Sequence, residues 1–289
     1  MTIAIHLSGG GALLTATDTQ ETYEPEKVES GKIISFSRLK PLGAISIAGA
    51  GDSHYVKAIS QKMSRMFDKF TGSLDELEFK IGETTLNFYN ESVLPFVGRL
   101  QDHNVPTYHL LIAATHEGNE RLWCVDRLAV TDEALFDCIG IGKPVADSLL
   151  NRLWPLYPTL DSLAILAAYV IYKAKSSVDG CGLKTEIRFM QNGRFGIGIV
   201  PAERIAAWEA LFGKYERMER EIFYHAMNFV LRPAAPPPAM LESMKAQGHT
   251  YDHETTFPAQ MRPMLEINKQ IGEMQAEVRK FPVLKPLGE

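Results

Sequence analysis

The spacing of apolar residues alternates between two patterns along this chain, and the order of the patterns constrains the fold more than any single motif. Short runs of apolar and β-branched residues between turn residues predict strands, whereas apolar residues three and four positions apart predict helices. The expected strands are residues 2–7, 11–18, 32–36, 43–48, 109–115, 121–126, 184–190 and 194–200. The expected helices are residues 53–70, a second helix through Val97 that Pro95 can interrupt, and residues 144–154 and 160–177.

This order is strands, two helices, strands, two helices and strands. Two sheets packed face to face between two helical layers bury such a pattern most simply, because each sheet then has one face against the other sheet and one face under helices. We therefore predict an α+β fold, a four-layer αββα sandwich, with a helical extension at its C-terminal end.

Proline usage predicts where the compact part ends. Eight of the 16 prolines lie in the last 57 residues, and the sequence RPAAPPPA after Leu231 cannot continue a helix. We expect a compact domain over residues 1–200, a long amphipathic helix over 201–232 and a Pro-rich arm over 233–289. The apolar residues of the arm predict that it contacts a neighbouring subunit; a mobile tail with one loose helix is the alternative.

Composition excludes several classes of partner. Thirty basic and 35 acidic side chains give a net charge of −5, which is unsuited to binding nucleic acid through its phosphates. The three cysteines are far apart, which predicts neither a disulfide framework nor a zinc site and fits a reducing cytoplasm. No segment resembles a secretory signal or a bilayer-spanning helix, so we expect no membrane association.

Conventional cofactor motifs are scarce. The turn IAGAGD at residues 47–52 superficially resembles a phosphate-binding loop but lacks the full dinucleotide fingerprint. His249 and His253 lie four residues apart in the Pro-rich arm, without a third ligand at a metal-site spacing, and are interpreted as solvated side chains. We therefore expect no cofactor and no metal.

The start of the chain offers a nucleophile. Thr2 is small enough for Met1 to be trimmed, which would expose a threonine with a free α-amine. Such an amine titrates near about 7.7–8, so it can accept the proton of its own hydroxyl group at neutral pH. Many chains begin with Met-Thr, so this feature acquires meaning only in combination with others.

In combination with several later segments, the start of the chain resembles a known family. The chain reads TIAIHLSGGGALLTATDTQ, then SGKIISF, then LGAISIAGAGDSHYVKAISQKM. Together with HLLIAATHEGNERLWCVD, these segments resemble proteasome β-subunits and their bacterial proteasome-like relatives, which are N-terminal-nucleophile hydrolases. The GKP at residues 142–144 resembles the bacterial branch, including the ancestral β-subunit group. The resemblance covers about residues 2–200 and implies the αββα sandwich of that family.

The resemblance also implies site residues. Thr2 falls on the nucleophile of the family, Asp18 on its acidic residue and Lys32 on its lysine, while Gly49 falls on the glycine whose N–H binds the oxyanion. Lys32 would lower the cost of forming the threonine alkoxide, and Asp18 would hold the lysine in place. The substrate pocket is expected at Ile47 and Gly51, which predicts an apolar and open pocket.

Other positions depart from the family pattern. Ile141 lies where active subunits carry a serine between two glycines, and it can make no side-chain hydrogen bond. A later aspartate and serine of the family align with Val178 and Cys181, and Asp179 could substitute if the loop shifts by one residue. These departures remove part of the network that orients the terminal amine.

Three functions follow from this pattern. The leading expectation is a cytoplasmic threonine peptidase that cleaves peptides or unfolded proteins within a homo-oligomeric ring, with an unfoldase as a possible partner. The second is a noncatalytic assembly protein that keeps the fold and the ring contacts. The third is an amidase of the same mechanism that acts on a nonpeptide amide.

Overall fold

The computed structural model of the chain describes residues 2–23, 26–39, 42–97, 106–230 and five positions between 269 and 276. The chain divides after Glu209 into two compact units. The first unit holds two five-stranded antiparallel sheets and the helices that cover them.

The first sheet has the strand order β10-β1-β2-β11-β12. Its strands are β1 (Ile3–Gly9), β2 (Ala12–Asp18), β10 (Phe136–Gly140), β11 (Thr185–Gln191) and β12 (Gly198–Ile199). The central strands β1 and β2 form a hairpin around Gly10 and Gly11, which both adopt the positive φ angles that glycine tolerates. The N-terminal strand is therefore held between two neighbours.

The second sheet has the order β5-β6-β7-β8-β9. Its strands are β5 (Ile33–Leu39), β6 (Leu42–Gly51), β7 (Tyr108–His116), β8 (Asn119–Asp126) and β9 (Ala129–Glu133). A two-stranded ribbon, β3 (Gln20–Tyr23) with β4 (Glu26–Glu29), connects the end of β2 to the start of β5. The chain thus passes from one sheet to the other through this ribbon.

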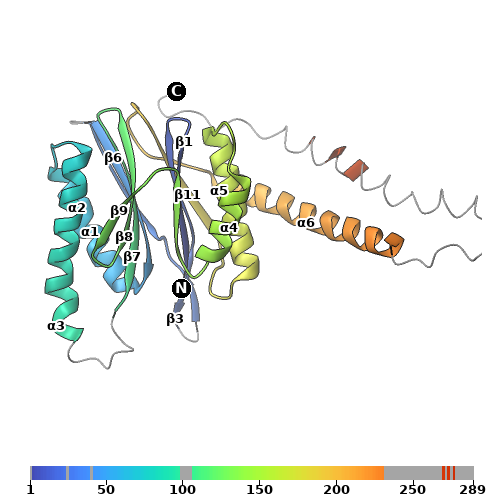
Figure 1. Ribbon diagram of the computed structural model, residues 1–289, viewed down its shortest axis with the longest axis horizontal. Coiled ribbons are helices and arrows are strands. Elements are labelled where there is room, and N and C mark those ends of the chain that lie inside the picture. The colour runs from blue at the N-terminus through green and yellow to red at the C-terminus, as the bar shows by residue number, and fades with distance from the viewer. Residues whose placement is uncertain are drawn as a thin grey trace, which may run out of the picture. The chain divides into compact units, whose positions relative to one another are not determined.

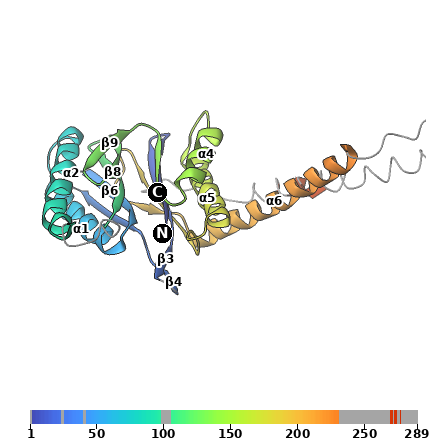
Figure 2. The same cartoon turned by 60° about the horizontal axis from the view of Figure 1, so that its bottom comes forward.

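Helices cover the outer face of each sheet (Figure 1). Helices α1 (Ser53–Lys69) and α2 (Leu74–Phe88) lie on the second sheet, and α4 (Lys143–Leu153) and α5 (Leu160–Ser177) lie on the first. Figure 2 shows the same four layers from another side. The predicted αββα sandwich is confirmed.

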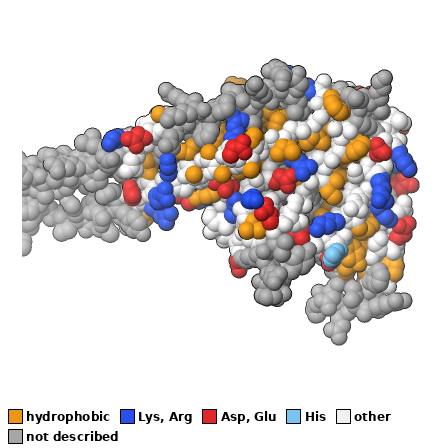
Figure 3. Space-filling model, turned by 180° about the vertical axis from the view of Figure 1, so that it is seen from behind, with side chains coloured by type: hydrophobic (Ala, Val, Ile, Leu, Met, Phe, Trp, Pro, Cys, Tyr) orange, Lys and Arg blue, Asp and Glu red, His pale blue; other side chains and the backbone are white. Residues whose placement is uncertain are grey.

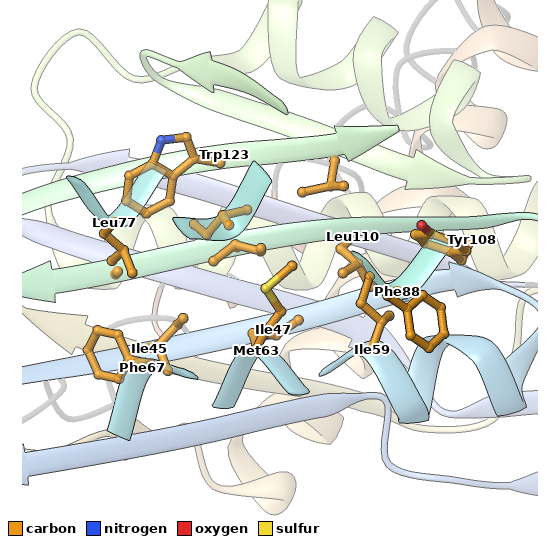
Figure 4. Packing of buried hydrophobic residues seen from close by; sticks show 14 of the residues in the cluster. Ile45, Ile47, Ile59, Met63, Phe67, Leu77, Phe88, Tyr108, Leu110 and Trp123 are labelled. Carbon is orange, nitrogen blue, oxygen red and sulfur yellow. The ribbon is translucent and has the colours of Figure 1, made fainter. Parts of the chain in front are cut away.

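Two kinds of apolar layer hold the sandwich together. Beneath α1 and α2, large side chains fill the space between helices and sheet, among them Ile45, Met63 and Phe67 (Figure 4). Between the two sheets the buried residues are smaller, and Ala4, Ala48 and Ala50 allow the sheets to approach closely. Close packing of this kind fixes the spacing of the sheets, because a well-packed interior has little free volume.

Several elements differ from the sequence-based expectation. The short strands β3, β4, β9 and β10 were not predicted, because five or fewer residues with interspersed charges show no clear alternation. The expected strand over 194–200 is reduced to β12, since Gly196 has a φ of +105° and leaves the extended conformation. Before Pro95, α2 continues as a π-helical turn (Tyr89–Val93) into α3 (Leu94–Val97), a common response to the missing proline N–H.

The C-terminal helix is present as predicted. Helix α6 (Ala202–Val230) closely matches the expected range, and the boundary between the two compact units falls within it. Apart from the five positions between 269 and 276, the Pro-rich arm lies outside the described residues, and so do His249 and His253. Contact of the arm with a neighbouring subunit stays a prediction.

Candidate active site

Three of the predicted site residues meet at one end of the sandwich. Thr2 directly precedes β1 and Asp18 is the last residue of β2. Because these strands are antiparallel, with Ala4 opposite Thr17, the start of β1 lies beside the end of β2. Lys32 directly precedes β5 of the other sheet. The cluster is thus assembled from both sheets.

The Thr2 hydroxyl lies between a cation and a carboxylate. Thr2 Oγ1 donates a hydrogen bond to Asp18 Oδ1 at 2.5 Å, and Lys32 Nζ donates to Thr2 Oγ1 at 2.5 Å. Lys32 Nζ also donates to Asp18 Oδ1 at 2.9 Å and to the carbonyl oxygen of Gln20. All three N–H donors of the ammonium group are therefore engaged.

Backbone groups fix the orientation of the Asp18 carboxylate. The N–H of Ile3 donates to Oδ1 at 3.0 Å, and the N–H of Gly182 donates to Oδ2 at 3.0 Å. Gly182 was not singled out from the sequence, because a backbone donor on a loop more than 160 residues away leaves no side-chain signal. A carboxylate held in this way can in turn fix the position of Lys32.

The cluster is shielded from water. Asp18 is fully buried, and the side chain of Lys32 is 7% exposed. Burial lowers the pKa of Lys32 from its usual value, and the neighbouring Asp18 carboxylate partly offsets this effect. A cation in such a site interacts strongly with negative charge that develops on Thr2 Oγ1, because little solvent screens the interaction.

A pocket of about 260 Å³ opens beside Thr2. Gly51, which was expected in the substrate pocket, and Gly49, which was expected to donate its N–H to the oxyanion, both line this pocket. A Cβ atom at Gly49 would collide with the Val56 side chain, which explains why a glycine is needed there. Ile47 does not line this pocket. Its side chain is 1% exposed and packs in the core beneath α1, on the same face of β6 but deeper.

Other residues of the pocket wall were missed by the sequence analysis. Lys57 Nζ of α1 lies 3.6 Å from Glu21 Oε1 of β3. The pocket is therefore not purely apolar, although an apolar pocket was expected. Ile34 and Val56 form an apolar part of the pocket wall. The charged pair gave no sequence signal, because its members lie 36 positions apart on a short unpredicted strand and on the face of a helix.

The departures from the family pattern lie around the same end of the sandwich. Ile141 is 43% exposed in the turn between β10 and α4. Asp179 is exposed in the turn after α5. In the loop that follows, Cys181 is buried and close enough to Asp18 for that carboxylate to contribute to raising the pKa of the Cys181 thiol, although burial is the main cause. The hydrogen bond from this loop to Asp18 comes from Gly182.

Gly140 contacts the backbone of Thr2. Its φ is +94°, and a Cβ atom there would collide with the carbonyl group of Thr2. We expect Gly140→Ala to displace Thr2 and lower the rate at which Thr2 reacts with an electrophile at least about 10²-fold, the effect of a misplacement of roughly 1 Å. The rate of covalent labelling by a threonine-directed epoxyketone measures this.

Gly196→Ala is the matched control for this substitution. Gly196 also has a positive φ, of +105°, but no atom lies within 4 Å of its Cβ position. Both variants carry comparable backbone strain, so both lose some thermal stability, whereas only Gly140→Ala should lose labelling. Equal labelling of the two variants would show that Gly140 has no role in placing Thr2.

One cluster among the described residues has metal-ligating atoms close together, namely Asp137, Cys138 and Asp147. Lys143 Nζ already lies 2.7 Å from Asp137 and 3.5 Å from Asp147, so its ammonium group compensates the negative charge. The cluster is therefore a partly exposed ion-pair network.

Two larger-scale observations bear on the expected partners. On the face shown in Figure 3, described acidic and basic side chains are interspersed rather than gathered into a basic field. Across the described residues, no helix combines the length and apolarity that a membrane span requires.

Comparison with known proteins gives a match of structure but not of sequence. No protein-family model and no curated protein matches the chain. Solved structures match well: Anbu (ancestral beta-subunit) from Yersinia bercovieri has a TM-score of 0.61 at 13% identity. The match covers 81% of this chain and 99% of that chain.

The fold is similar to that of the Anbu proteins. An Anbu (Gly-1) mutant from Hyphomicrobium sp. strain MC1 has a TM-score of 0.63 at 12% identity, with 81% of this chain and 99% of that one covered. The helical assembly of the Anbu complex from Pseudomonas aeruginosa has a TM-score of 0.58 at 12% identity, with 82% and 99% covered.

This finding corrects the assignment made from sequence motifs. The chain was assigned to the proteasome β-subunit-like family, but its structural neighbours are Anbu proteins, a distinct branch of the proteasome-like N-terminal-nucleophile fold. At such low identity the likeness is one of fold alone. The quoted segments fall mostly on β1, β2, β5, β6, β7 and β8, where any such sandwich requires small and apolar residues, so they indicate the sandwich but not the branch.

Proposed function

We propose that this protein is an N-terminal-nucleophile hydrolase that cleaves an amide bond, most simply a peptide bond, through Thr2 after removal of Met1. The observation that carries the proposal is the contact of Thr2 Oγ1 with both Lys32 Nζ and Asp18 Oδ1 at 2.5 Å. A hydroxyl group between a buried ammonium and a buried carboxylate, beside an open pocket, is suited to nucleophilic attack.

In the proposed reaction, the α-amine of Thr2 accepts the hydroxyl proton and Thr2 Oγ1 attacks the substrate carbonyl carbon. Lys32 stabilises the negative charge on Oγ1 as it develops, and the Gly49 N–H stabilises the oxyanion of the tetrahedral intermediate. The amine then donates the proton to the leaving nitrogen, which leaves an ester on Thr2. Water hydrolyses this ester, the amine again acting as the base, and regenerates the hydroxyl group.

The buried ion pair argues for catalysis over the noncatalytic alternative. Burying Lys32 and Asp18 together costs desolvation free energy that a purely structural protein could avoid with apolar residues. The third possibility, a nonpeptide amide as substrate, uses the same chemistry and differs only in what enters the pocket.

We further propose that the protein assembles from identical subunits in the cytoplasm. The solved Anbu complex from Pseudomonas aeruginosa is described as a helical assembly, and the three cysteines of this chain are free thiols, which suits a reducing compartment. The sequence-based expectation was a ring. Light scattering on the purified full chain distinguishes a closed ring of fixed mass from an open assembly whose mass rises with concentration.

The decisive test is the mass of the intact protein. We expect the purified protein to lack Met1, and incubation with an epoxyketone that reacts with N-terminal threonine to add one inhibitor mass per chain. Fragmentation should place the adduct on Thr2. Retention of Met1 on the purified protein would rule out the proposed mechanism, because the terminal amine would then belong to the wrong residue.

A further inference from the structure

The three most exposed large apolar side chains of the described residues lie in opposite layers of the sandwich. Leu156 is 92% exposed, Tyr157 87% and Phe79 71%. Phe79 lies on α2, which covers the second sheet, whereas Leu156 and Tyr157 lie in the loop between α4 and α5, which cover the first sheet (Figure 1). Apolar side chains that gather at the surface mark sites where another protein binds.

The loop between α4 and α5 is fixed at both of its ends. At one end the ring of Trp154 packs on that of Phe136, with 5.2 Å between the ring centroids. At the other end Pro158 packs against the β1–β2 turn. Leu156 and Tyr157 lie between these anchors and form a preorganised apolar projection, here called the Leu156–Tyr157 knob. A preorganised group loses little conformational entropy when it is bound.

The surface around Phe79 is hollowed. A groove of about 640 Å³ is lined by the apolar side chains of Phe79, Leu86 and Val130, and we call it the Phe79 groove. This volume lies within the roughly 300–1,000 Å³ of sites that hold drug-sized molecules, so it can hold the two side chains of the knob. An aromatic or aliphatic side chain seated in such a groove is typical of the centre of a protein interface.

The border of the groove carries an excess of negative charge, because four carboxylates there pair with only two cations. The carboxylates are those of Asp75, Glu78, Glu83 and Asp132, and the cations are those of Lys80 and Arg121. Beside the knob, Arg152 is exposed at the end of α4. Asp161 is half-buried in the first turn of α5, where it has an intramolecular interaction and the helix dipole compensates its charge.

These charges decide how the two surfaces can pair. Two Phe79 grooves facing each other would bring their acidic borders together, and two knobs facing each other would bring two exposed Arg152 side chains together. A knob seated in a groove avoids both repulsions and places Arg152 near the acidic border. It also covers the exposed apolar side chains of both surfaces.

We infer that the Leu156–Tyr157 knob of one subunit inserts into the Phe79 groove of a second copy of this chain. The inference rests on the proposed self-assembly and names the surfaces that carry it, and it does not depend on the proposed chemistry. Because knob and groove lie in opposite outer layers, each subunit binds one neighbour through its knob and another through its groove. Such a head-to-tail contact closes into a ring or continues as an open helix.

Variants of the full chain test the inference through their mass in solution. Leu156→Ser/Tyr157→Ser removes the knob, and Phe79→Gln removes the aromatic ring of the groove. All three side chains are exposed, so both variants should unfold at nearly the wild-type temperature. Light scattering over a range of concentrations should show that half-assembly of each variant requires at least about tenfold more protein than that of the wild type, because both changes remove anchors of the interface.

Ile199→Ser is the matched control. Ile199 is 62% exposed on β12, outside both the knob and the groove, so the loss of this apolar side chain should leave assembly unchanged. An equal loss of assembly in Ile199→Ser, or wild-type assembly by the knob and groove variants, would overturn the inference and leave the proposed self-assembly standing.

A mixture of the two variants tests the head-to-tail pairing. At a concentration at which the wild type assembles and each variant alone is a monomer, an equimolar mixture should form pairs and nothing larger. The Phe79→Gln subunit keeps its knob and the knob variant keeps its groove, so one contact forms and no third subunit can be added. A mixture that stays monomeric, or that grows beyond pairs, would refute this pairing.

A wild-type chain that is itself a monomer at all concentrations would overturn both this inference and the proposed self-assembly. The epoxyketone adduct on Thr2 would still report on the proposed chemistry in that case, because the two surfaces lie outside the residues that line the Thr2 pocket. Failure of the adduct in a protein whose mixed variants form pairs would instead reject the chemistry and retain the contact.

Discussion

Thr2→Ala is expected to abolish amide cleavage and epoxyketone labelling, a loss of at least about 10⁴-fold, as for other hydrolytic nucleophiles. Thr2→Ser should retain measurable activity, because it keeps both the hydroxyl group and the α-amine. Alanine and serine are both small enough for Met1 to be trimmed, so the variants differ only in the hydroxyl group. Labelling kinetics followed by intact mass give both rates.

Residual cleavage by Thr2→Ala at more than a trace of the wild-type rate would mean that another group is the nucleophile. Thermal unfolding of the same samples tests whether the alanine variant loses activity only because it unfolds. The alanine variant loses the hydrogen bond to Asp18, so a destabilisation of about 1 kcal/mol is expected. That loss is too small to unfold an ordinary domain and explain absent activity.

Lys32→Met should produce the second large effect. Methionine keeps an unbranched side chain but removes the cation that contacts Thr2 Oγ1, so we expect the labelling rate to fall about 10²–10³-fold. It also leaves Asp18 buried without its cation, which predicts a loss of stability of about 3–5 kcal/mol. Urea unfolding and labelling kinetics measure the two losses separately.

The double variant Lys32→Met/Asp18→Asn separates activity from stability. Removing both charges should restore much of the stability, because no uncompensated charge remains, but it should not restore labelling. Recovery of labelling in the double variant would contradict the role of the Lys32 cation. Lys62→Met, which removes an exposed partner of Glu91, is the control and should change neither quantity appreciably.

The pH dependence of labelling gives a further expectation for Lys32. Because burial lowers the pKa of this ammonium group, Lys32 loses its proton at a lower pH than an ordinary lysine. The stabilising cation is therefore lost as the pH rises toward the ordinary lysine value, so the labelling rate should decline there. The Lys32→Met variant should lack this alkaline decline.

The layers of the fold could be predicted from local apolar patterns, whereas the meeting of Thr2, Asp18 and Lys32 was implied by the resemblance to a known family. The hairpin of β1 and β2 brings Thr2 and Asp18 together at the same end of the first sheet. The contacts that the sequence did not predict join residues that lie far apart in the chain. Gly182 reaches Asp18, and Glu21 reaches Lys57, only through the complete sandwich.

Ile47 illustrates why the packing of helices on a sheet is needed to describe a pocket. The family resemblance placed Ile47 in the pocket wall, and Ile47 does lie on the same face of β6 as Gly49 and Gly51. In the structure the α1 side chains Ile59 and Met63 share its cluster, so Ile47 belongs to the core. Sequence spacing gives the face of a strand but not the depth at which a helix closes over it.

The arrangement of Lys32 makes the site sensitive to the gap between the sheets. Its ammonium group, carried by the second sheet, holds Thr2 and Asp18 of the first, and the spacing is set by a thin layer rich in alanine. A slip of one sheet over the other by an ångström would leave secondary structure intact and yet separate Lys32 from Thr2. Heating should therefore inactivate the protein before it unfolds.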